Sequence, residues 1–136
     1  MKIIGLDFGT KYIGISISDM QQKMAFPRGK AEQNKLIPEV KKLILEEDVE
    51  LVVLGKPTNL KGQNTAMTNQ VEEFKASLEK QISVPVQFYD ERLTSKIVDR
   101  SLSSMNVNTR KRRELKDTLE ATQILQSFLD QKNARK

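Results

Sequence analysis

The sequence predicts an α/β fold in which a five-stranded mixed sheet is flanked by helices. Three segments with strand-like patterns stand together at the N-terminus, and the first two are close enough to pair as an antiparallel hairpin. Two further strands each follow a helical pattern, and a helix crossover joins parallel strands. The expected order is therefore βββαβαβαα. With 136 residues, the chain is expected to form a single domain over residues 1–136.

The N-terminal segments alternate in the way that half-buried strands do. Ile13, Ile15 and Ile17 share one face of the second segment, opposite small residues. Residues 9–11 leave room only for a tight turn, and Pro27 favours the sheet edge for the third strand. We expect the first strand to be central, because the crossover strands must pair on its other side. The three strands are expected at residues 2–8, 12–18 and about 23–29.

The rest of the chain alternates between helical and strand-like patterns. Leu36, Val40 and Leu43 recur at helical spacing after Asn34, which can cap this helix. The apolar run at residues 51–54 suits a strand that is buried on both faces. Beyond it, the expected elements are a helix at 67–78, a strand at 84–89, a helix at 97–105, a basic linker at 106–113 and a last helix at 115–129.

Composition narrows the chemistry that is available. The chain has no cysteine and no histidine, which excludes the usual zinc sites, cysteine nucleophiles and Ser-His triads. No apolar run approaches the roughly 20 residues that span a bilayer, so no membrane partner is expected. The net charge of +5 suits an anionic partner. Five basic residues fall close together: Arg110, Lys111, Arg112, Arg113 and Lys116.

Asp7 is an acid in a strand that is expected to be central. It shares a face with Ile3 and Gly5, where a carboxylate costs several kcal/mol unless it is paired or coordinates a metal. The residues expected opposite are glycine and serine, which leave space above it. The alternative is that Asp7 only caps the turn at residues 9–10.

Three further acids fall where the predicted fold could bring them near Asp7. Asp90 and Glu91 end the fifth strand, and the carboxyl ends of parallel strands face the active crevice in α/β sheets. An acid at a helix N-terminus is the alternative for Glu91. Asp117, expected in the first turn of the last helix, lies on one stripe with Ala121 and Ile124. An ordinary acid near a helix N-terminus is the alternative there.

Together Asp7, Glu91 and Asp117 could form a cluster of oxygen ligands. Two divalent ions about 3.5–4 Å apart can activate a water and stabilise the leaving oxygen in phosphodiester cleavage. Carboxylates suit Mg²⁺ or Mn²⁺, and no histidine is required. The pattern therefore predicts a metal-dependent nuclease.

Two basic segments could hold the phosphate backbone of a nucleic acid. The loop after Gly55 offers Lys56, Thr58 and Asn59 as donors to a phosphate, although a plain connecting loop fits equally well. The basic run at residues 110–116 could contact the backbone as well, and a solvated linker is its alternative.

These motifs together resemble the YqgF family, also called RuvX, of RuvC-like Holliday junction resolvases that were later assigned as pre-16S rRNA nucleases. They occur in the family's order along nearly the whole chain. Tyr12 departs from the family, which usually has arginine there, as does Glu120, where alanine is common. The segments that carry the resemblance are Gly5-Leu6-Asp7-Phe8-Gly9-Thr10-Lys11 with Gly14 and Ser18-Asp19, Gly55-Lys56-Pro57 with Gly62, Asp90-Glu91-Arg92-Leu93-Thr94, and Lys116-Asp117 with Ala121 and Ile124-Leu125-Gln126.

The resemblance implies an RNase H-like fold and a cytoplasmic bacterial protein that helps to mature the small-subunit ribosomal RNA. It implies that Asp7, Glu91 and Asp117 are the catalytic, metal-binding acids. The expected partner is structured RNA, above all pre-ribosomal RNA alone or in ribosomal particles, or branched DNA. A monomer and a homodimer both stay open. The candidate nucleic-acid contacts are Lys11, Lys56, Asn59, Arg92, Arg110, Lys111, Arg112 and Arg113.

Two other functions compete with a nuclease. The segment at residues 7–10 also resembles the first phosphate loop of actin-like ATPases and sugar kinases, but those enzymes enclose ATP between two lobes and this chain supplies one. The second is a non-catalytic RNA-binding or ribosome-assembly module with the same fold. If the protein is a nuclease, these residues do not decide whether its substrate is ribosomal RNA or a DNA junction. RNA specificity rests on shape, loops and 2′-hydroxyl contacts, which no motif here encodes.

Overall fold

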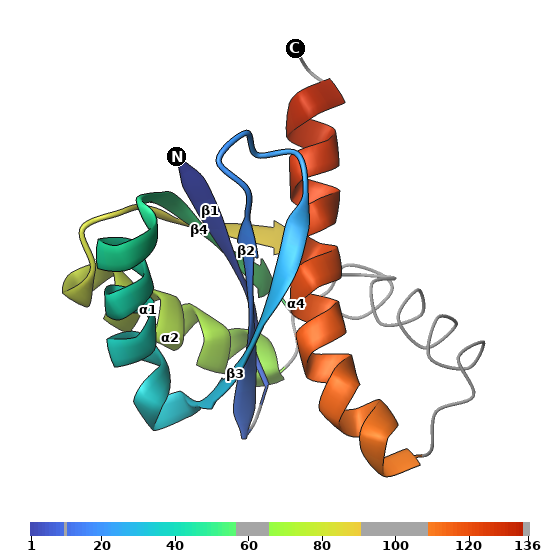
Figure 1. Ribbon diagram of the computed structural model, residues 1–136. Coiled ribbons are helices and arrows are strands. Elements are labelled where there is room, and N and C mark those ends of the chain that lie inside the picture. Colours follow the sequence, from blue (N-terminus) through green and yellow to red (C-terminus); the bar gives the residue numbers. More distant parts are fainter. Residues whose placement is uncertain (10, 57–65, 91–108, 135–136) are drawn as a thin grey trace.

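Strand β1 (Lys2–Asp7) lies at the centre of a five-stranded sheet in the computed structural model of the protein (Figure 1). The structure describes residues 1–9, 11–56, 66–90 and 109–134, so the helix predicted at 97–105 lies outside the described residues. The other elements are β2 (Tyr12–Ser18), β3 (Ala25–Glu32), α1 (Gln33–Glu47), β4 (Val49–Lys56), α2 (Ala66–Gln81), β5 (Val86–Asp90) and α4 (Thr109–Ala134).

The sheet is mixed, in the order β3-β2-β1-β4-β5. β1 pairs antiparallel with β2 and parallel with β4; β2 pairs antiparallel with β3, and β4 pairs parallel with β5. β1 is central because the short turn after it forces a hairpin on one side, whereas α1 carries the chain across to the other side. The predicted mixed sheet, its strand directions and its central first strand are confirmed.

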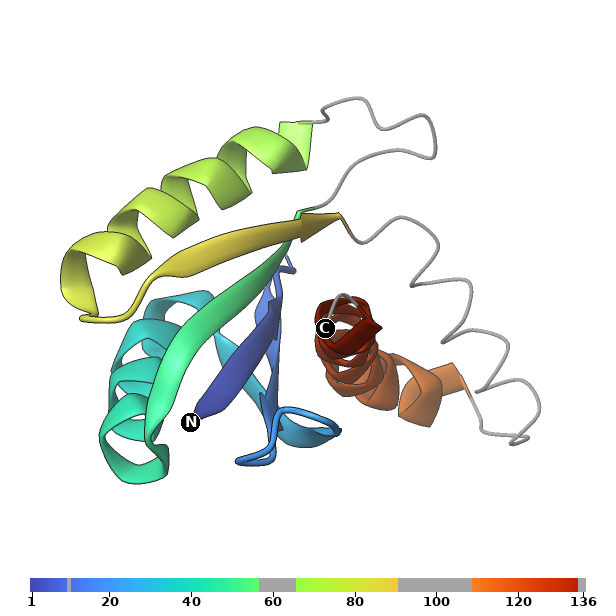
Figure 2. The same ribbon diagram turned by 90° about the horizontal axis from the view of Figure 1, so that it is seen from above.

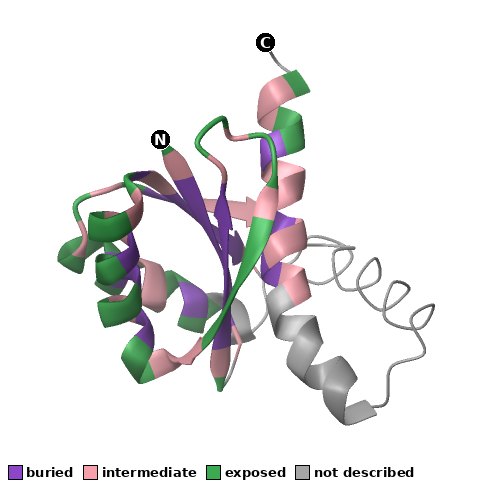
Figure 3. Ribbon diagram, viewed as in Figure 1, coloured by how far each residue is buried: buried purple, intermediate pink, exposed green. Residues whose placement is uncertain are grey.

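The two faces of the sheet are covered by different helices (Figure 2). On one face Ile4, Leu6 and Ile13 form the larger core cluster with buried residues of α1 and α2. On the other face the sheet packs against α4 alone among the described helices. Figure 3 shows that the buried residues follow the inner strands and the sheet-facing side of the helices. The fully buried members of the α4 cluster are Ile3, Val53, Ile124, Leu125 and Leu129.

The last helix is longer than the sequence pattern predicts. α4 begins at Thr109, so the predicted linker at 106–113 is wrong from residue 109 onward. Arginine, lysine, glutamate and leucine fill its first turns, and all four are good helix formers. Repulsion between neighbouring like charges costs only about 0.2–0.5 kcal/mol per pair, which does not prevent the helix. Asp117 therefore lies two turns inside α4 and not in its first turn.

The start of α1 also differs from the prediction. The helix begins at Gln33, and the residue before it, Glu32, makes no side-chain cap hydrogen bond. The predicted cap, Asn34, lies inside the helix, because β3 runs directly into α1 and leaves no turn in which a cap could form. β3 itself starts later than predicted, since the Asp19 side chain accepts a 2.8 Å hydrogen bond from the backbone N–H of Lys23 and closes a turn there.

The end of α1 is bound to two strands through one carboxylate. Glu47 Oε2 lies 2.6 Å from Lys2 Nζ on β1, and Glu47 Oε1 lies 2.7 Å from an Arg28 guanidinium nitrogen on β3. The hydrogen bonds from Lys2 and then Arg28 hold the pKa of the Glu47 carboxyl below its usual value of 4.5. This carboxylate therefore connects the central strand, the edge strand and the helix between them.

Glu47→Gln should make the protein less sensitive to acid. Because the folded-state pKa of Glu47 is lowered, its contribution to stability is fully present above the usual value of 4.5 and is lost as the pH falls through the lowered pKa. The melting temperature of Glu47→Gln should lie below that of the parent at neutral pH, and the gap should close in acid. Thermal melts across this pH range measure it, with the exposed Glu46→Gln as control. A gap that stays constant in acid would contradict the assignment.

Candidate active site

Asp7 is the last residue of β1 and is buried, with 7% of its surface exposed. It pairs with Gly14 across the hairpin, and Gly5, two residues earlier, pairs with Ser16. Ile3 on the same face belongs to the cluster beneath α4. The prediction that Asp7 shares a face with Ile3 and Gly5, opposite glycine and serine, is confirmed. Asp7 therefore lies on the face that α4 covers.

A serine and a glycine bring α4 close to this face. The Ser16 hydroxyl donates a hydrogen bond of 2.7 Å to the backbone carbonyl oxygen of Ala121, and it lies 3.2 Å from the carbonyl oxygen of Gly5. A Cβ atom on Gly5 would lie 2.5 Å from Ser16 Oγ and 2.7 Å from Leu125 Cβ. Only glycine at this position allows the helix backbone to approach so closely.

The contacts show that α4 runs antiparallel to β1. Ile3 packs in the cluster of Leu125 and Leu129, whereas Gly5 meets Leu125 and the carbonyl of Ala121. Two residues along a strand advance about 6.6 Å, and four residues along a helix advance about 6 Å. The step from Gly5 to Asp7 therefore matches the helical turn from Ala121 back to residue 117. From Ala121 back to residue 117, α4 therefore runs in the direction of the end of β1.

The turn after Asp7 is fixed from two sides. A Cβ atom on Gly9 would lie 2.4 Å from the Tyr12 carbonyl oxygen, so the turn requires glycine there. The Gln33 side chain at the start of α1 donates a 3.0 Å hydrogen bond to the Gly9 carbonyl oxygen. The end of β1 is therefore held by the hairpin and by α1 together.

Lys56, a predicted phosphate contact, points to the other side of the sheet. It ends β4 and pairs in register with Asp90 at the end of β5. Its ammonium lies 3.5 Å from Glu72 of α2 and 5.2 Å from the ring centroid of Phe88, which packs in the α1 and α2 core. Lys56 thus reaches the same end of the sheet as Asp7 but from the opposite face.

The remaining predicted residues fall into three groups. Asn59, Glu91 and Arg92 lie outside the described residues, and Glu91 directly follows the end of β5. The basic run at residues 110–113 lies in the first turns of α4, about one to two turns before residue 117. Lys11 is exposed in the turn after Asp7.

Sequence reasoning missed Lys30. Gly14 pairs with Asp7 on one side and with Lys30 of β3 on the other, so the three residues form one row across the sheet. The Lys30 ammonium lies 4.4 Å from the ring centroid of Tyr12. No spacing in the sequence links Lys30 to Asp7; only the pairing register of three strands does.

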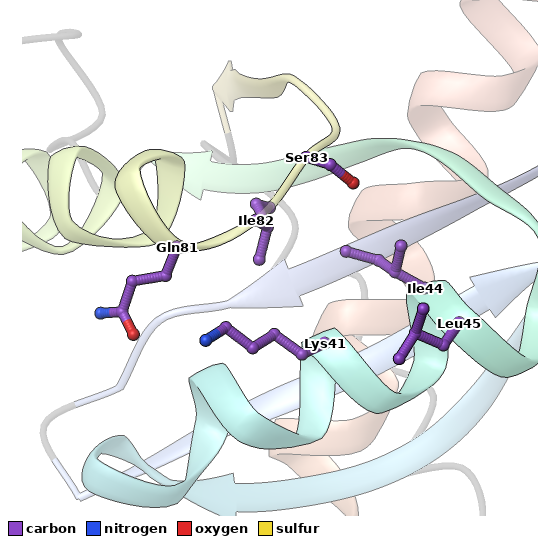
Figure 4. Close-up of a pocket in the computed structure, with 6 residues that line it drawn as sticks. All are labelled: Lys41, Ile44, Leu45, Gln81, Ile82 and Ser83. Atoms are coloured by element: carbon purple, nitrogen blue, oxygen red, sulfur yellow. The ribbon is translucent and has the colours of Figure 1, made fainter.

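An apolar pocket of about 220 Å³ opens at the opposite end of the strands, between α1 and the segment that joins α2 to β5 (Figure 4). It lies where β4 and β5 begin, whereas Asp7 lies at the end where they finish, so the pocket takes no part in the acid site. The residues that line it are Lys41, Ile44, Leu45, Gln81, Ile82 and Ser83. Within the described ranges, none of the helices is both long and apolar enough to cross a membrane.

Comparison with known proteins gives three findings. The family described as "RuvX: Holliday junction resolvase" matches residues 1–131. Proteins named "Putative pre-16S rRNA nuclease" include one from Natranaerobius thermophilus, 35% identical over 96% of this chain and 94% of its own length. One from Maridesulfovibrio salexigens is 37% identical over 95% of this chain and 98% of its own. Thermus thermophilus RuvC in complex with a Holliday junction substrate superposes with a TM-score of 0.60 at 13% identity, covering 98% of this chain and 96% of RuvC.

The sheet order, the helix on the Asp7 face and the superposition define an α/β protein with the RNase H-like fold of RuvC, as the sequence resemblance implies. The family match covers nearly the whole chain and the relatives are similar over almost their full length. The chain belongs to the RuvX family.

Gly5→Ala should weaken the packing of α4 against β1 and so lower the stability of the protein. The added methyl group would overlap Ser16 Oγ and Leu125 Cβ, and the helix must move away to admit it. Overpacking of this kind costs about 1–3 kcal/mol. Urea unfolding of the variant should show this loss in the free energy of unfolding.

Ser77→Ala on the exposed side of α2 is the control for this measurement and should unfold as the parent does. If Gly5→Ala were as stable as the parent, the close contact between α4 and β1 would not constrain the helix.

Proposed function

We propose that this chain is a divalent-metal-dependent nuclease that hydrolyses phosphodiester bonds in structured RNA, with pre-16S rRNA as its substrate in ribosome biogenesis. The observation that carries the proposal is the buried carboxylate of Asp7 at the end of the central strand, beneath a helix that bears Asp117. The names of the relatives support the substrate. We propose that the protein acts on this substrate, free or in ribosomal particles, in the bacterial cytoplasm. We also propose that residues 1–136 form one nuclease domain.

We assign catalysis to Asp7, Glu91 and Asp117. The direction of α4 against β1 supports Asp117, because residue 117 lies one helical turn from Ala121 toward the end of β1. Tyr89 packs edge-on against Phe128 of α4, with ring centroids 6.1 Å apart, so it lies on the α4 side of the sheet. Glu91 comes two residues later, and the two-residue period of an extended chain is the reason we assign it to that side too.

The residues at hand fit Mg²⁺ or Mn²⁺. Asp7 is a buried carboxylate on the face of a sheet, an arrangement that is stable when the charge is paired or coordinated. The three proposed ligands offer only carboxylate oxygens, which hard divalent cations prefer. Asp7, Glu91 and Asp117 would hold the ion or ions. When bound, they supply an activated water and charge stabilisation for the leaving oxygen.

The chain itself contributes a fixed geometry. The buried contact of Gly5, Ser16 and Ala121 sets the distance between the backbones of β1 and α4, and a fixed backbone distance supports a site that is formed before a substrate binds. Residues 110–113 precede Asp117 on α4, so a phosphate held there would lie along the same helix as the acid. Further proposed contacts to the phosphate backbone are Lys11, Asn59 and Arg92. Lys56 would join them if its ammonium left Glu72 for a phosphate.

A Holliday junction resolvase is the second candidate, favoured by the family description and by the RuvC-like fold. Both functions need the same acids and differ in substrate. Cleavage of a precursor 16S rRNA fragment compared with a four-way DNA junction separates them, and a protein that binds RNA but cuts neither would be an assembly module.

Asp7→Asn should abolish cleavage without unfolding the protein. Asparagine keeps the volume of the side chain but cannot offer a full negative charge to a hard cation. Acids that converge on one site repel each other without metal, so the metal-free variant should be at least as stable as the parent. Mg²⁺ or Mn²⁺ should raise the melting temperature of the parent more than that of the variant. Paired melting curves and cleavage of a structured RNA measure both effects.

Asp130→Asn is the matched control, because Asp130 is exposed near the far end of α4. It should cleave at the parental rate. An Asp7→Asn protein that folds and still cleaves would remove Asp7 from the mechanism, and one that unfolds would make Asp7 a structural residue.

Replacing the basic run with alanine should weaken RNA binding in a salt-dependent way. Each phosphate contact that is lost should lower the slope of log affinity against log salt by about 0.7–0.9. The measurement is a salt titration of RNA binding by the variant with residues 110–113 replaced. A control variant with alanine at Lys41, Lys42 and Lys80, far from Asp7, should keep the parental slope. If the first variant kept the parental slope, residues 110–113 would form the start of α4 but have no role in RNA binding.

A further inference from the structure

Two lysine side chains lie near the ring of Tyr12 at the start of β2. The ammonium of Lys30 lies 4.4 Å from the centroid of its ring, and that of Lys11 lies 5.4 Å from it. Both lysines are exposed, and Tyr12 is only partly buried. The other tyrosine, Tyr89, instead packs against Phe128 in the α4 cluster. Since cation–π contacts at exposed sites are weak, this cluster contributes little to the core and is open to a ligand.

The cluster lies beside the proposed acid site. Gly14 pairs with both Asp7 and Lys30, so residues on three adjacent strands form one row. Neighbouring strands are about 4.8 Å apart, which sets the backbones of Asp7 and Lys30 about 10 Å apart. Gly14 contributes no side chain between them. Because directly paired residues share a face, the Lys30 position belongs to the same face of the sheet as Asp7.

Other basic side chains near Tyr12 are paired with acids, so Lys11 and Lys30 are the basic groups next to its ring. A hollow of about 400 Å³ opens between β3 and α1, and Tyr12 and Lys30 are among the residues that line it. Ile15 and Ala31 in its lining pack in the α1 and α2 core, so the hollow itself opens on the face opposite α4, and the ring cluster stands at the strand edge between the two faces. Arg28 in its wall is paired with Glu47, and Lys35 lies 3.9 Å from Glu32. The ammonium groups of Lys11 and Lys30 instead lie near the aromatic ring of Tyr12. The other residues that line the hollow are Ile15, Ala31 and Glu39.

We propose that Tyr12, Lys30 and Lys11 bind one unpaired nucleotide of the RNA substrate next to the acid site: the ring stacks on the base, and the two ammonium groups contact the adjoining phosphates. The proposal rests on the nuclease function above and defines its substrate further, as structured RNA with an unpaired flank. Every base has a π-face, so stacking tolerates any sequence. The site therefore positions the strand relative to Asp7 and does not read its bases.

The chain allows a direct test, because it has two tyrosines and no tryptophan. Tyrosine fluorescence is followed while an RNA hairpin with an unpaired adenosine tail is added in the presence of a chelator, so that no cleavage occurs. The same hairpin without the tail is the control ligand. The tailed hairpin should quench the parent. Tyr12→Phe, which keeps an aromatic ring, should bind with parental affinity and lose the quench.

Two further variants separate stacking from charge. Tyr12→Leu should bind the tailed hairpin roughly 5- to 150-fold more weakly, the range found for loss of one stacked base, and the blunt hairpin as the parent does. Lys30→Gln should lower the salt slope for the tailed hairpin by about 0.7. Lys42→Gln, an exposed lysine of α1, should leave the slope unchanged.

A quench that survives in Tyr12→Phe, or a parental salt slope in Lys30→Gln, would overturn the proposal; both variants test it even if Tyr12→Leu fails to fold. The outcome is distinct from failure of the nuclease function. Parental binding in all the variants together with Asp7-dependent cleavage would reject this binding site alone. A parent that neither binds nor cuts either hairpin or the precursor 16S rRNA fragment would reject both.

Discussion

The structure depends on the contact at which α4 rests on β1 and β2. Gly5 has no side chain, so the helix backbone approaches the strand until the Ser16 hydroxyl bonds to the Ala121 carbonyl oxygen. A hydroxyl and a carbonyl that are buried together must bond to each other or leave a polar group unsatisfied, which costs about 1–3 kcal/mol. The helix is therefore held in one register, and that register decides which residues of α4 stand beside the end of β1.

The two faces of the sheet differ in the residues that they present. The face under α1 and α2 carries most of the buried apolar residues. The face under α4 has a smaller apolar cluster around Ile3, and glycine, serine and Asp7 follow it along the strands. The residues paired or next in register to Asp7 on this face are glycine and serine, so few side-chain atoms surround its carboxylate on the neighbouring strand. Edge strand β3 extends the same face with Lys30.

The strand pattern of the N-terminal half was predictable because its physical cause is local. Alternation in residues 12–18, a short turn and a proline at the edge fix the pairing of β1, β2 and β3 without reference to the rest of the chain. Element ends were less predictable. The pattern placed a linker where α4 begins at Thr109 and a cap at Asn34, because helix ends are set by the packing of the neighbouring elements as much as by the residues themselves.

The sequence by itself determined the α/β class, the central position of β1 and the candidate acids, since periodicity and a carboxylate in an apolar strand can be read along the chain. Only the tertiary structure decided which side chains share a face at the end of that strand. It put Lys56 on the far face with Glu72 and brought Lys30 into the row of Asp7. Both depend on the register between strands, and a shift of one residue in that register exchanges the two faces of the sheet.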